Sequence, residues 1–507
     1  MNKKTLILIV FIAVKFLLEY LLISPQYDLQ RDEYLHLDLG NHLAWGYMSV
    51  PPFTSWTSWI IQLFGNSFFW VKFFPALYGC LTLLVVWKAI EELKGNLFAL
   101  VLGLTCTLFS CLLRLNMLYQ PNSFDVLSWT VLYFILIKYI NSENSKWLFI
   151  GAFVFAVGFL NKYNIVFLFI GLLPALLLTK QREIFTKPIL YKAMLLGLLL
   201  ILPNLIWQYQ NDFPVIHHMK ILAETQLVNV NRWDFIKSQL LFFPGSLIVI
   251  ITSFYAFIFY KPFKNYRFFF FSFCFTLIAF LYFKAKDYYA IGIYPIHIAF
   301  GAVYLESILN DGWKKYLKLV LIAIPLLFFI PMYNIAFPNK SPDYIVQNSE
   351  KYKKLGMLRW EDGKDHALPQ DYADMLGWKE LARKVDSVYL TLPNKNKTLI
   401  VCDNYGQAGA INYYTKQNLK AVSFNADYVN WFDLSVKYQN LIRVKDYNDN
   451  IEELEQTSPY FQKSMLAGAV TNQYSREFGT PIFVFIGAKI DINKRIIEEI
   501  EKEKKHR

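Results

Sequence analysis

The sequence predicts an α-helical polytopic membrane protein with about eleven transmembrane helices, followed by a small exported α/β domain. Hydrophobic residues make up 55% of the 507 residues and the mean hydropathy is +0.29, which is too apolar for a soluble enzyme of this length. Apolar runs long enough to cross a bilayer recur as far as residue 336. Beyond that point they give way to short alternating stretches between helical patterns, which are typical of an α/β domain.

The predicted spans follow from the lengths of the apolar runs, because a helix needs roughly 17–25 apolar residues to cross a bilayer. Tight breaks at 161–164 and 284–288 separate neighbouring runs, so the number carries a margin of about one or two helices. The predicted spans are residues 5–24, 67–88, 96–113, 122–140, 147–161, 164–179, 189–207, 239–260, 267–283, 288–308 and 316–336.

The charges of the connecting loops predict the orientation. Residues 1–336 hold 26 Lys and Arg against 16 Asp and Glu, whereas residues 337–507 hold 25 against 23. With a cytoplasmic N-terminus, sixteen of the basic residues of the first part fall inside and nine outside, as the positive-inside rule requires. An odd number of spans then puts the C-terminal domain outside. Cytoplasmic loops thus explain the basic excess, and no basic motif with interleaved aromatic residues indicates a nucleic-acid partner.

We expect two domains: a transmembrane catalytic domain at 1–336, with its first exterior loop at 25–66, and an exported α/β domain at 337–507. Cys402 is the single cysteine of the exported domain, so that domain cannot form an internal disulfide. The sequence has no CxxC or Cys/His metal spacing, which excludes zinc-ribbon and redox functions. Strands are predicted at 398–403, 421–424 and 482–486.

The first exterior loop contains YDLQRDEYLHLDLGNHLAWGYMSVPPFTSW, which is too long and too rich in Asp, Glu and His to be a simple connector. Asp32 and His36 lie one helical turn apart, on a side that also carries leucines, so a solvated polar face fits poorly. An acid at the membrane interface can take a proton from an acceptor hydroxyl, hold a metal or bind sugar hydroxyls. The alternative is that Asp32 caps an interfacial helix.

Two further loops put polar residues on the exterior face. Asp125 opens the fourth span in LYQPNSFDVLSW, where it is either a second functional acid or a helix cap. Lys162 and Tyr163 lie in GFLNKYN between the fifth and sixth spans, on the side that the positive-inside rule disfavours for Lys. A cation kept there can hold a lipid phosphate, and the alternative is ordinary snorkelling of the side chain.

A divalent metal is an alternative that the sequence leaves open. The loop PNLIWQYQNDFPVIHHMK brings His217 and His218 to the exterior face. Together with His36 or Glu33 they have the ligand types of a metal site, although adjacent histidines are usually incidental.

The loop FKAKDYYAIGIYP, between the ninth and tenth spans, combines cations with hydroxyl donors. The departure of a phosphate leaving group builds negative charge, which such side chains stabilise. We therefore predict substrate contacts from Lys284, Lys286, Tyr288 and Tyr289.

These loops resemble the bacterial members of the protein mannosyltransferase and aminoarabinose transferase family, which are family 39-like integral-membrane glycosyltransferases of the GT-C fold. The resemblance is spread in order over most of the chain. It rests on RDEYLHLDLGNHLAWGYMSVPPF, GFLNKYN, PNLIWQYQNDFP, KAKDYYAIGIYP, VCDNYGQAGAINYY and NQYSREFGTPIFVFIG.

The resemblance implies inverting transfer of a sugar from a polyprenyl-phosphate carrier, such as undecaprenyl phosphate, at the outer face of the bacterial inner membrane. Acceptors in such proteins are diverse, so an envelope glycolipid, lipid A or a protein all remain open. Asp32 and Glu33 match the acidic pair of the family, and Asp125 lies where relatives often have a second acid. One departure is Val50, which stands where relatives commonly have His or Gln before paired prolines.

The same resemblance implies that Lys162, Lys286 and Tyr288 meet the donor phosphate. A flippase or transporter of lipid-linked sugars is the alternative function, and it should carry ionisable residues near the middle of the bilayer. Here the polar residues gather at one face, apart from Lys15 and Glu19 in the first span, which favours a catalyst. A membrane-tethered scaffold is a third alternative, in which the exported domain would be the functional part.

Overall fold

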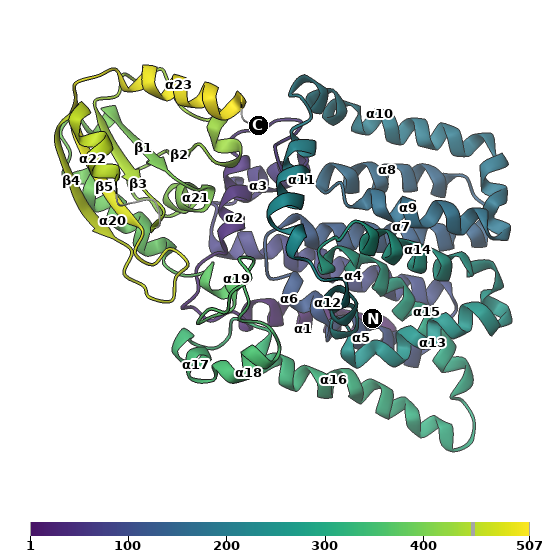
Figure 1. The fold of residues 1–507 in the computed structure, drawn as a ribbon. Coiled ribbons are helices and arrows are strands. Elements are labelled where there is room, and N and C mark those ends of the chain that lie inside the picture. Colours follow the sequence, from purple (N-terminus) through teal and green to yellow (C-terminus); the bar gives the residue numbers. More distant parts are fainter. Residues whose placement is uncertain (1, 448–451, 506–507) are drawn as a thin grey trace.

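The computed structural model describes residues 2–447 and 452–505. Its first part contains α1 (Lys3–Leu21), α2 (Arg31–Leu39), α3 (Phe53–Leu63), α4 (Phe68–Glu92), α5 (Leu97–Leu108), α6 (Cys111–Leu115), α7 (Pro121–Ser142), α8 (Lys146–Asn161), α9 (Ile165–Leu177), α10 (Pro188–Gln210), α11 (Pro214–Thr225), α12 (Arg232–Leu241), α13 (Leu247–Phe259), α14 (Phe268–Tyr282), α15 (Tyr294–Ile308) and α16 (Leu317–Ile335). The longer helices lie side by side as a bundle, and a sheet domain lies beyond one end of it (Figure 1). The predicted fold class, a helical membrane protein with a small C-terminal α/β domain, is thus confirmed.

The bundle has the composition and packing of helices that live in lipid. A hydrocarbon environment leaves no water for backbone groups, so the chain satisfies them within helices. The bundle's interior is rich in aromatic rings, such as Phe257 and Phe300, whose centroids lie 4.7 Å apart. Many leucines and isoleucines face outward instead, including those of α10 and α16 at two edges of the bundle.

Every predicted apolar run coincides with helical structure. Fewer than eleven of these helices, however, are long and apolar enough to cross a bilayer on their own. Among the described residues, five helical segments are long and apolar enough to span a bilayer, and two bent pairs raise this to seven. The pairs bend by 106° after α9 and by 66° between α12 and α13. The run at 96–113 is broken between α5 and α6. The structure therefore supports a multi-pass membrane protein, and the number eleven stays a prediction.

The second part builds a mixed five-stranded sheet in the order β2-β1-β3-β5-β4. Strand β1 pairs in parallel with β2 and β3, while β5 runs antiparallel to both β3 and β4. The elements are α17 (Pro342–Gln347), α18 (Ser349–Lys354), α19 (Gln370–Ala373), α20 (Trp378–Leu390), β1 (Thr398–Cys402), α21 (Tyr405–Tyr414), β2 (Ala421–Ser423), β3 (Asn440–Val444), α22 (Glu453–Thr457), β4 (Phe461–Ala469), β5 (Pro481–Ala488) and α23 (Ile492–Lys505).

The three predicted strands correspond to β1, β2 and β5, whereas β3 and β4 are absent from the prediction. The sequence of β4, FQKSMLAGA, carries a weak signal because the strand lies at the sheet edge and most of its side chains are exposed. The sequence of β3, NLIRV, is short and begins with a polar residue. Strand propensity alone does not separate such segments from loops.

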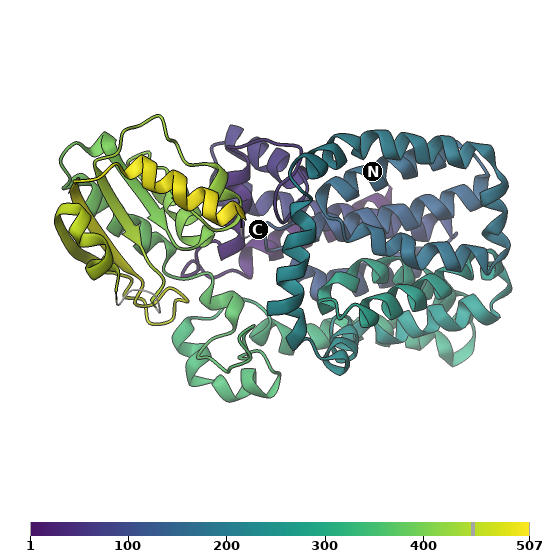
Figure 2. The ribbon, with the colours of Figure 1, turned by 45° about the horizontal axis from the view of Figure 1, so that its top comes forward.

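The bundle and the sheet domain have separate hydrophobic cores, and α2 belongs to the second. The bundle core extends through α17 and α19 as far as Leu376, so it includes a segment that follows the last bundle helix. A second core begins at Trp378 and joins α20, α21 and one face of the sheet to Tyr34, Leu35 and Leu37 of α2. The opposite face of the sheet packs against α23. Helices α2 and α3 consequently lie between the bundle and the sheet domain, as the turned view also shows (Figure 2).

Candidate functional site

Helix α2 carries the acidic pair predicted from the sequence, and its start is fixed by a capping box. The Gln30 side chain accepts a hydrogen bond from the Asp32 backbone N–H at 2.9 Å, and the Glu33 carboxylate accepts from the Gln30 N–H at 2.7 Å. Seven of the nine residues of α2 are buried. The two neighbouring acids therefore have separate environments, since Glu33 is fully buried while Asp32 is partly exposed.

Glu33 is saturated with donors and forms a buried ion pair. Lys72 Nζ, on α4, lies 2.6 and 2.8 Å from its two carboxylate oxygens, and the Tyr119 N–H donates to Oε1 at 2.6 Å. Both charged side chains are essentially inaccessible. A buried charge pair of this kind costs much to break. Glu33 thus fixes α2 to the bundle, and the geometry favours this positioning role over the predicted catalytic or metal-binding one.

Asp32 keeps a partly exposed carboxylate that is held from two sides. The Tyr405 hydroxyl, from the first residue of α21 in the sheet domain, donates to Oδ1 at 2.7 Å. The Gln120 amide, just before α7, donates to Oδ2 at 3.2 Å. Asp32 is therefore oriented by residues that lie 373 and 88 positions away in the sequence.

From Asp32 a series of hydrogen bonds leads to Lys162. The Asn122 amide donates to the Gln120 side chain at 2.9 Å, and Lys162 Nζ donates to Asn122 Oδ1 at 2.7 Å. Lys162 Nζ also lies 4.1 Å from the ring centroid of Tyr289. We call Tyr405, Asp32, Gln120, Asn122 and Lys162 the polar chain. It joins a candidate base to a cation across three separate loops.

The rings of Tyr288 and Tyr289 line the cationic end of the polar chain. Lys162 Nζ lies 5.3 Å from the Tyr288 centroid, and the two rings meet edge to face at 4.9 Å. Lys162 is in turn joined to Asp32 through Asn122 and Gln120. The structure thus brings both predicted tyrosines together with Lys162 and Asp32.

Asp125 lies in the first turns of α7 and is buried. The indole N–H of Trp129 donates to Oδ1 at 3.0 Å, and the amide of Asn164 donates to Oδ2 at 2.8 Å. The same amide donates to the Tyr289 backbone carbonyl at 3.1 Å. Asp125 therefore ties the turn that bears Lys162 to α7, which supports the geometry of the polar chain.

Tyr163 is turned away from the polar chain. Its hydroxyl donates to Asn204 Oδ1 and accepts from the Gln208 amide, both at 3.0 Å. Asn204 in turn donates to the Trp45 carbonyl at 2.7 Å. Tyr163 therefore links the α8–α9 turn to α10, and its predicted substrate contact stays a prediction.

The two other predicted lysines differ from Lys162. Lys286 Nζ lies 3.1 Å from the Glu361 carboxylate, so its charge is already partnered. The Lys284 backbone has a φ of 51°, and its side chain has neither a hydrogen bond nor an ion pair to any described residue. Lys162 is consequently the predicted cation that the structure connects to Asp32, through the side chains of Asn122 and Gln120.

The histidines do not converge on a metal site. Within residues 2–447 and 452–505, no three His, Cys, Asp or Glu side chains are arranged to hold a metal ion. Burial lowers the pKa of His36 to about 4, and burial together with Lys286 lowers the pKa of His218. His217 is exposed on α11, which buries none of its residues. The cluster considered from the sequence, made of these histidines and Glu33, is thus not formed.

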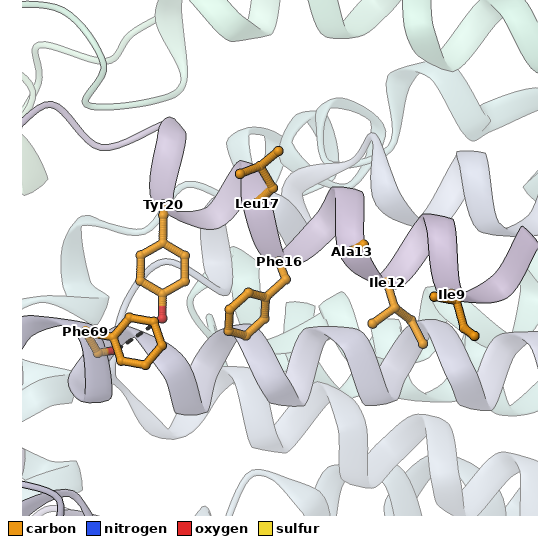
Figure 3. Close-up of a pocket in the computed structure, with 7 residues that line it drawn as sticks. All are labelled: Ile9, Ile12, Ala13, Phe16, Leu17, Tyr20 and Phe69. Carbon is orange, nitrogen blue, oxygen red and sulfur yellow. Dashed lines mark hydrogen bonds between the residues drawn. The ribbon is translucent and has the colours of Figure 1, made fainter. Parts of the chain in front are cut away.

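An apolar groove of about 550 Å³ lies elsewhere, on the outer side of α1 (Figure 3). Phe16 and Tyr20 point from α1 toward α4, where the Tyr20 hydroxyl donates to the Phe69 carbonyl at 3.1 Å. None of its lining residues belongs to the polar chain. In a membrane protein such a surface faces lipid.

Sequence reasoning missed Tyr405, Gln120 and Asn122 as members of the site. Each lies inside a segment that the sequence had already singled out, either VCDNYGQAGAINYY or LYQPNSFDVLSW. Their neutral side chains gave no electrostatic signal of their own. Their role appears only once the three loops and the sheet domain are brought together.

Comparison with known proteins agrees with the fold described above, a helical membrane bundle followed by a sheet domain. Residues 49–207 match the family model described as dolichyl-phosphate-mannose-protein mannosyltransferase. The crystal structure of ArnT from Cupriavidus metallidurans bound to undecaprenyl phosphate superposes with a TM-score of 0.63 at 11% identity, covering 95% of this chain and 98% of that one. The apo structure of the same protein gives 0.62 at 13% identity, with the same coverage.

A search of curated proteins found no match to the sequence. The structural likeness extends over nearly the full length of both chains and establishes the fold. This chain therefore has the GT-C fold of ArnT, and its resemblance to the mannosyltransferase and aminoarabinose transferase type is confirmed.

Proposed function

We propose that this GT-C protein is an integral-membrane glycosyltransferase, which moves a sugar from a polyprenyl-phosphate carrier to an acceptor at the exterior face of the bacterial inner membrane. The observation that carries the proposal is the polar chain, which connects the partly exposed Asp32 carboxylate to Lys162. The match to a mannosyltransferase model and the undecaprenyl phosphate in the ArnT structure support a lipid-phosphate donor.

In this proposal the two ends of the polar chain have complementary tasks. Asp32 takes the proton of an acceptor hydroxyl while that oxygen forms a bond to the anomeric carbon of the sugar. The bond from this carbon to the phosphate oxygen breaks, and its electron pair leaves with the lipid phosphate. Lys162 stabilises the charge that develops there. One in-line displacement inverts the anomeric centre. Where the acceptor is already an anionic phosphate, Asp32 only orients the substrates.

The two other polar groups at this face support the reacting pair. In the proposal the Tyr288 hydroxyl donates to the departing phosphate, and the ring centroid of Tyr288 lies 5.3 Å from Lys162 Nζ. Asp125 holds the turn that carries Lys162 through Asn164. Reactions of this kind depend on such fixed geometry, because a misplaced donor loses much of its effect on the transition state.

The proposal also specifies a membrane arrangement. The N-terminus is cytoplasmic and the sheet domain is exterior, so the polar chain lies at the outer leaflet, where it meets the donor. The buried charges inside the first span do not indicate a transport path, because Lys15 and Glu19 neutralise one another at 2.7 Å. This pairing favours a transferase over a flippase.

The test uses the purified full-length protein in lipid nanodiscs. The substrates are a panel of undecaprenyl-phosphate monosaccharides with an envelope lipid and protein extract as acceptor, and the released undecaprenyl phosphate is measured. We expect release from at least one donor, and a loss of several orders of magnitude in Asp32→Asn with an unchanged unfolding temperature. The control is Asp38→Asn, at the other end of α2, which should retain turnover.

Two results would contradict the proposal. One is the absence of release from every donor of the panel, and the other is full activity of Asp32→Asn. Movement of intact donor across a vesicle membrane without cleavage would instead support a flippase. Retention of the anomeric configuration in the product would exclude the inverting displacement.

A further inference from the structure

The sheet domain forms hydrogen bonds with α2 near both ends of this helix. At the start of the helix, the Tyr405 hydroxyl donates to Asp32 Oδ1. Near its end, the Tyr428 hydroxyl donates to Asp38 Oδ2 at 2.5 Å, and the Asn412 amide donates to the same oxygen at 2.7 Å. Two tyrosines of one domain thus bind two carboxylates of one helix, but only the first carboxylate belongs to the polar chain.

Tyr405 occupies a particular place in the sheet domain. Strand β1 lies between β2 and β3, and the chain passes from β1 through α21 to β2 on one side before returning to β3 on the other. The end of β1 is therefore the point where the strand order reverses, which is where open α/β sheets bind their ligands. Asn404 and Gln407 form a capping box there, which fixes the direction of α21 and the position of Tyr405.

In this protein the start of α2 fills that place. The Arg31 guanidinium lies 4.5 Å above the Tyr405 ring. Gly406 makes this approach possible, because a Cβ there would lie 2.7 Å from Arg31 Cγ and 3.1 Å from the Trp378 ring. The Arg31 backbone N–H also donates to the Asp374 carbonyl at 3.0 Å. The ligand position of the sheet domain is thus occupied by the chain's own candidate catalytic helix.

The contact with Tyr405 gives the two carboxylate oxygens of Asp32 different hydrogen-bond partners. Burial raises the pKa of Tyr405, and the nearby Asp32 raises it further, so the phenol stays protonated and donates. Its bond to Oδ1 is short, whereas Oδ2 receives the longer bond from Gln120. Tyr405 therefore fixes the rotation of the carboxylate, so that Oδ2 faces Gln120.

We infer that the sheet domain is a working part of the reaction site, in which Tyr405 acts as a positioning residue that orients Asp32 for proton transfer. The inference rests on the proposed function, because it assigns Tyr405 a role through the proposed base. It differs from a scheme in which the exported domain only captures the acceptor. Under the inference, the Tyr405 hydroxyl contributes to turnover and leaves donor binding unchanged.

The experiment compares Tyr405→Phe with Tyr428→Phe in the nanodisc assay described above. Both variants remove one hydroxyl that the sheet domain donates to an α2 carboxylate, and both keep the aromatic ring. A hydrogen bond to a charged group is worth enough to change turnover by roughly 10- to 100-fold. We expect such a fall in kcat for Tyr405→Phe at unchanged donor KM, and near-normal kcat for Tyr428→Phe at equal or greater loss of thermal stability.

The double variant Asp32→Asn/Tyr405→Phe separates this inference from the proposed function. If Tyr405 acts through Asp32, the double variant should be no slower than Asp32→Asn alone. Equal kcat losses in Tyr405→Phe and Tyr428→Phe would show that the contacts only dock the domain, and normal kcat in Tyr405→Phe would also overturn the inference. In either case a strong defect of Asp32→Asn would leave the proposed transferase intact. An unaffected Asp32→Asn would instead remove the proposed function itself.

Discussion

Two short helices at the same face of the bundle, α2 and α11, both carry residues that the sequence marked as functional. In α2 seven of nine residues are buried, whereas α11 buries none of its twelve. Helix α2 is held by an ion pair from the bundle and by hydroxyls from the sheet domain, while α11 runs across the end of the bundle (Figures 1 and 2). Two helices with similar polar residues thus have different roles, because the packing around them differs.

This comparison shows that the candidate site on α2 differs from α11 in the fixed geometry of its side chains and not in its polar composition. A proton-transfer group needs a defined position relative to its substrate. Asp32 has one because its neighbours along α2 are packed into the core of the sheet domain. His217, on the exposed helix α11, has no such support.

The largest expected effect comes from removing the ion pair between Lys72 and Glu33, which holds α2 to the bundle. Lys72→Met leaves Glu33 buried without its charged partner, which should lower the free energy of unfolding by about 3–5 kcal/mol. Thermal or denaturant unfolding in detergent measures this. Lys88→Met is the matched control on the same helix, because it removes an exposed pair with Glu91 and should cost less than about 1 kcal/mol. Equal losses in both variants would show that α2 is not anchored by this pair.

The next effect concerns donor binding at the other end of the polar chain. Lys162→Met removes the cation that we assign to the lipid phosphate, so the donor KM should rise roughly 10- to 100-fold. The kcat should fall as well, because Lys162 also stabilises the departing phosphate. Steady-state kinetics with undecaprenyl-phosphate sugars measure both constants. Lys284→Met removes a lysine from a neighbouring loop and should change KM much less. An equal rise in both variants would mean that general positive charge, and not the polar chain, attracts the donor.

A smaller effect distinguishes the buried histidine of α2 from the exposed one of α11. Burial lowers the pKa of His36 to about 4, below its usual 6.5, so the folded state binds this proton less tightly than the unfolded chain. The stability from neutral His36 is complete above pH 6.5 and is lost as the pH falls toward 4. Relative to His36→Gln, the wild type should lose about 2 kcal/mol of unfolding free energy between pH 7 and 5.

Unfolding titrations at the two pH values measure this difference. His217→Gln serves as the control, since it replaces an exposed side chain and should show the wild-type pH dependence. If His36→Gln has the same pH dependence as the wild type, the buried histidine does not control acid stability.

The smallest expected effect is on α11. His217→Ala/His218→Ala should change kcat and donor KM by less than about twofold, because the described residues offer these histidines no metal-binding partners. The nanodisc assay measures both constants. A large loss of activity would place α11 in the reaction site and would remove the contrast between the two helices.

Much of the architecture could be predicted from the sequence. Long apolar runs correspond to helices because lipid leaves the backbone no other partners. The one-turn spacing of Asp32 and His36 indicated a helix there, and α2 confirms it, although the residue that caps it is Gln30 and not Asp32. Strand β4 was not predicted, since its side chains are mostly exposed and show little alternation.

The candidate site was predictable only in part. The sequence singled out Asp32 and Lys162, and the structure connects them. The sequence could not distinguish the role of Glu33 from that of Asp32, because these adjacent acids differ only in the residues that surround them in space. The sequence also could not show that the Tyr163 hydroxyl donates to Asn204 on α10.

By itself, the sequence determined that the chain forms a helical membrane part and a sheet domain, because hydropathy and periodicity act locally along the chain. Only the tertiary structure decided that Tyr405 contacts Asp32 and that Lys72 neutralises Glu33. Those contacts join positions 373 and 39 residues apart. Burial and hydrogen bonding depend on neighbours in space, and no local pattern of residues specifies which distant side chains these will be.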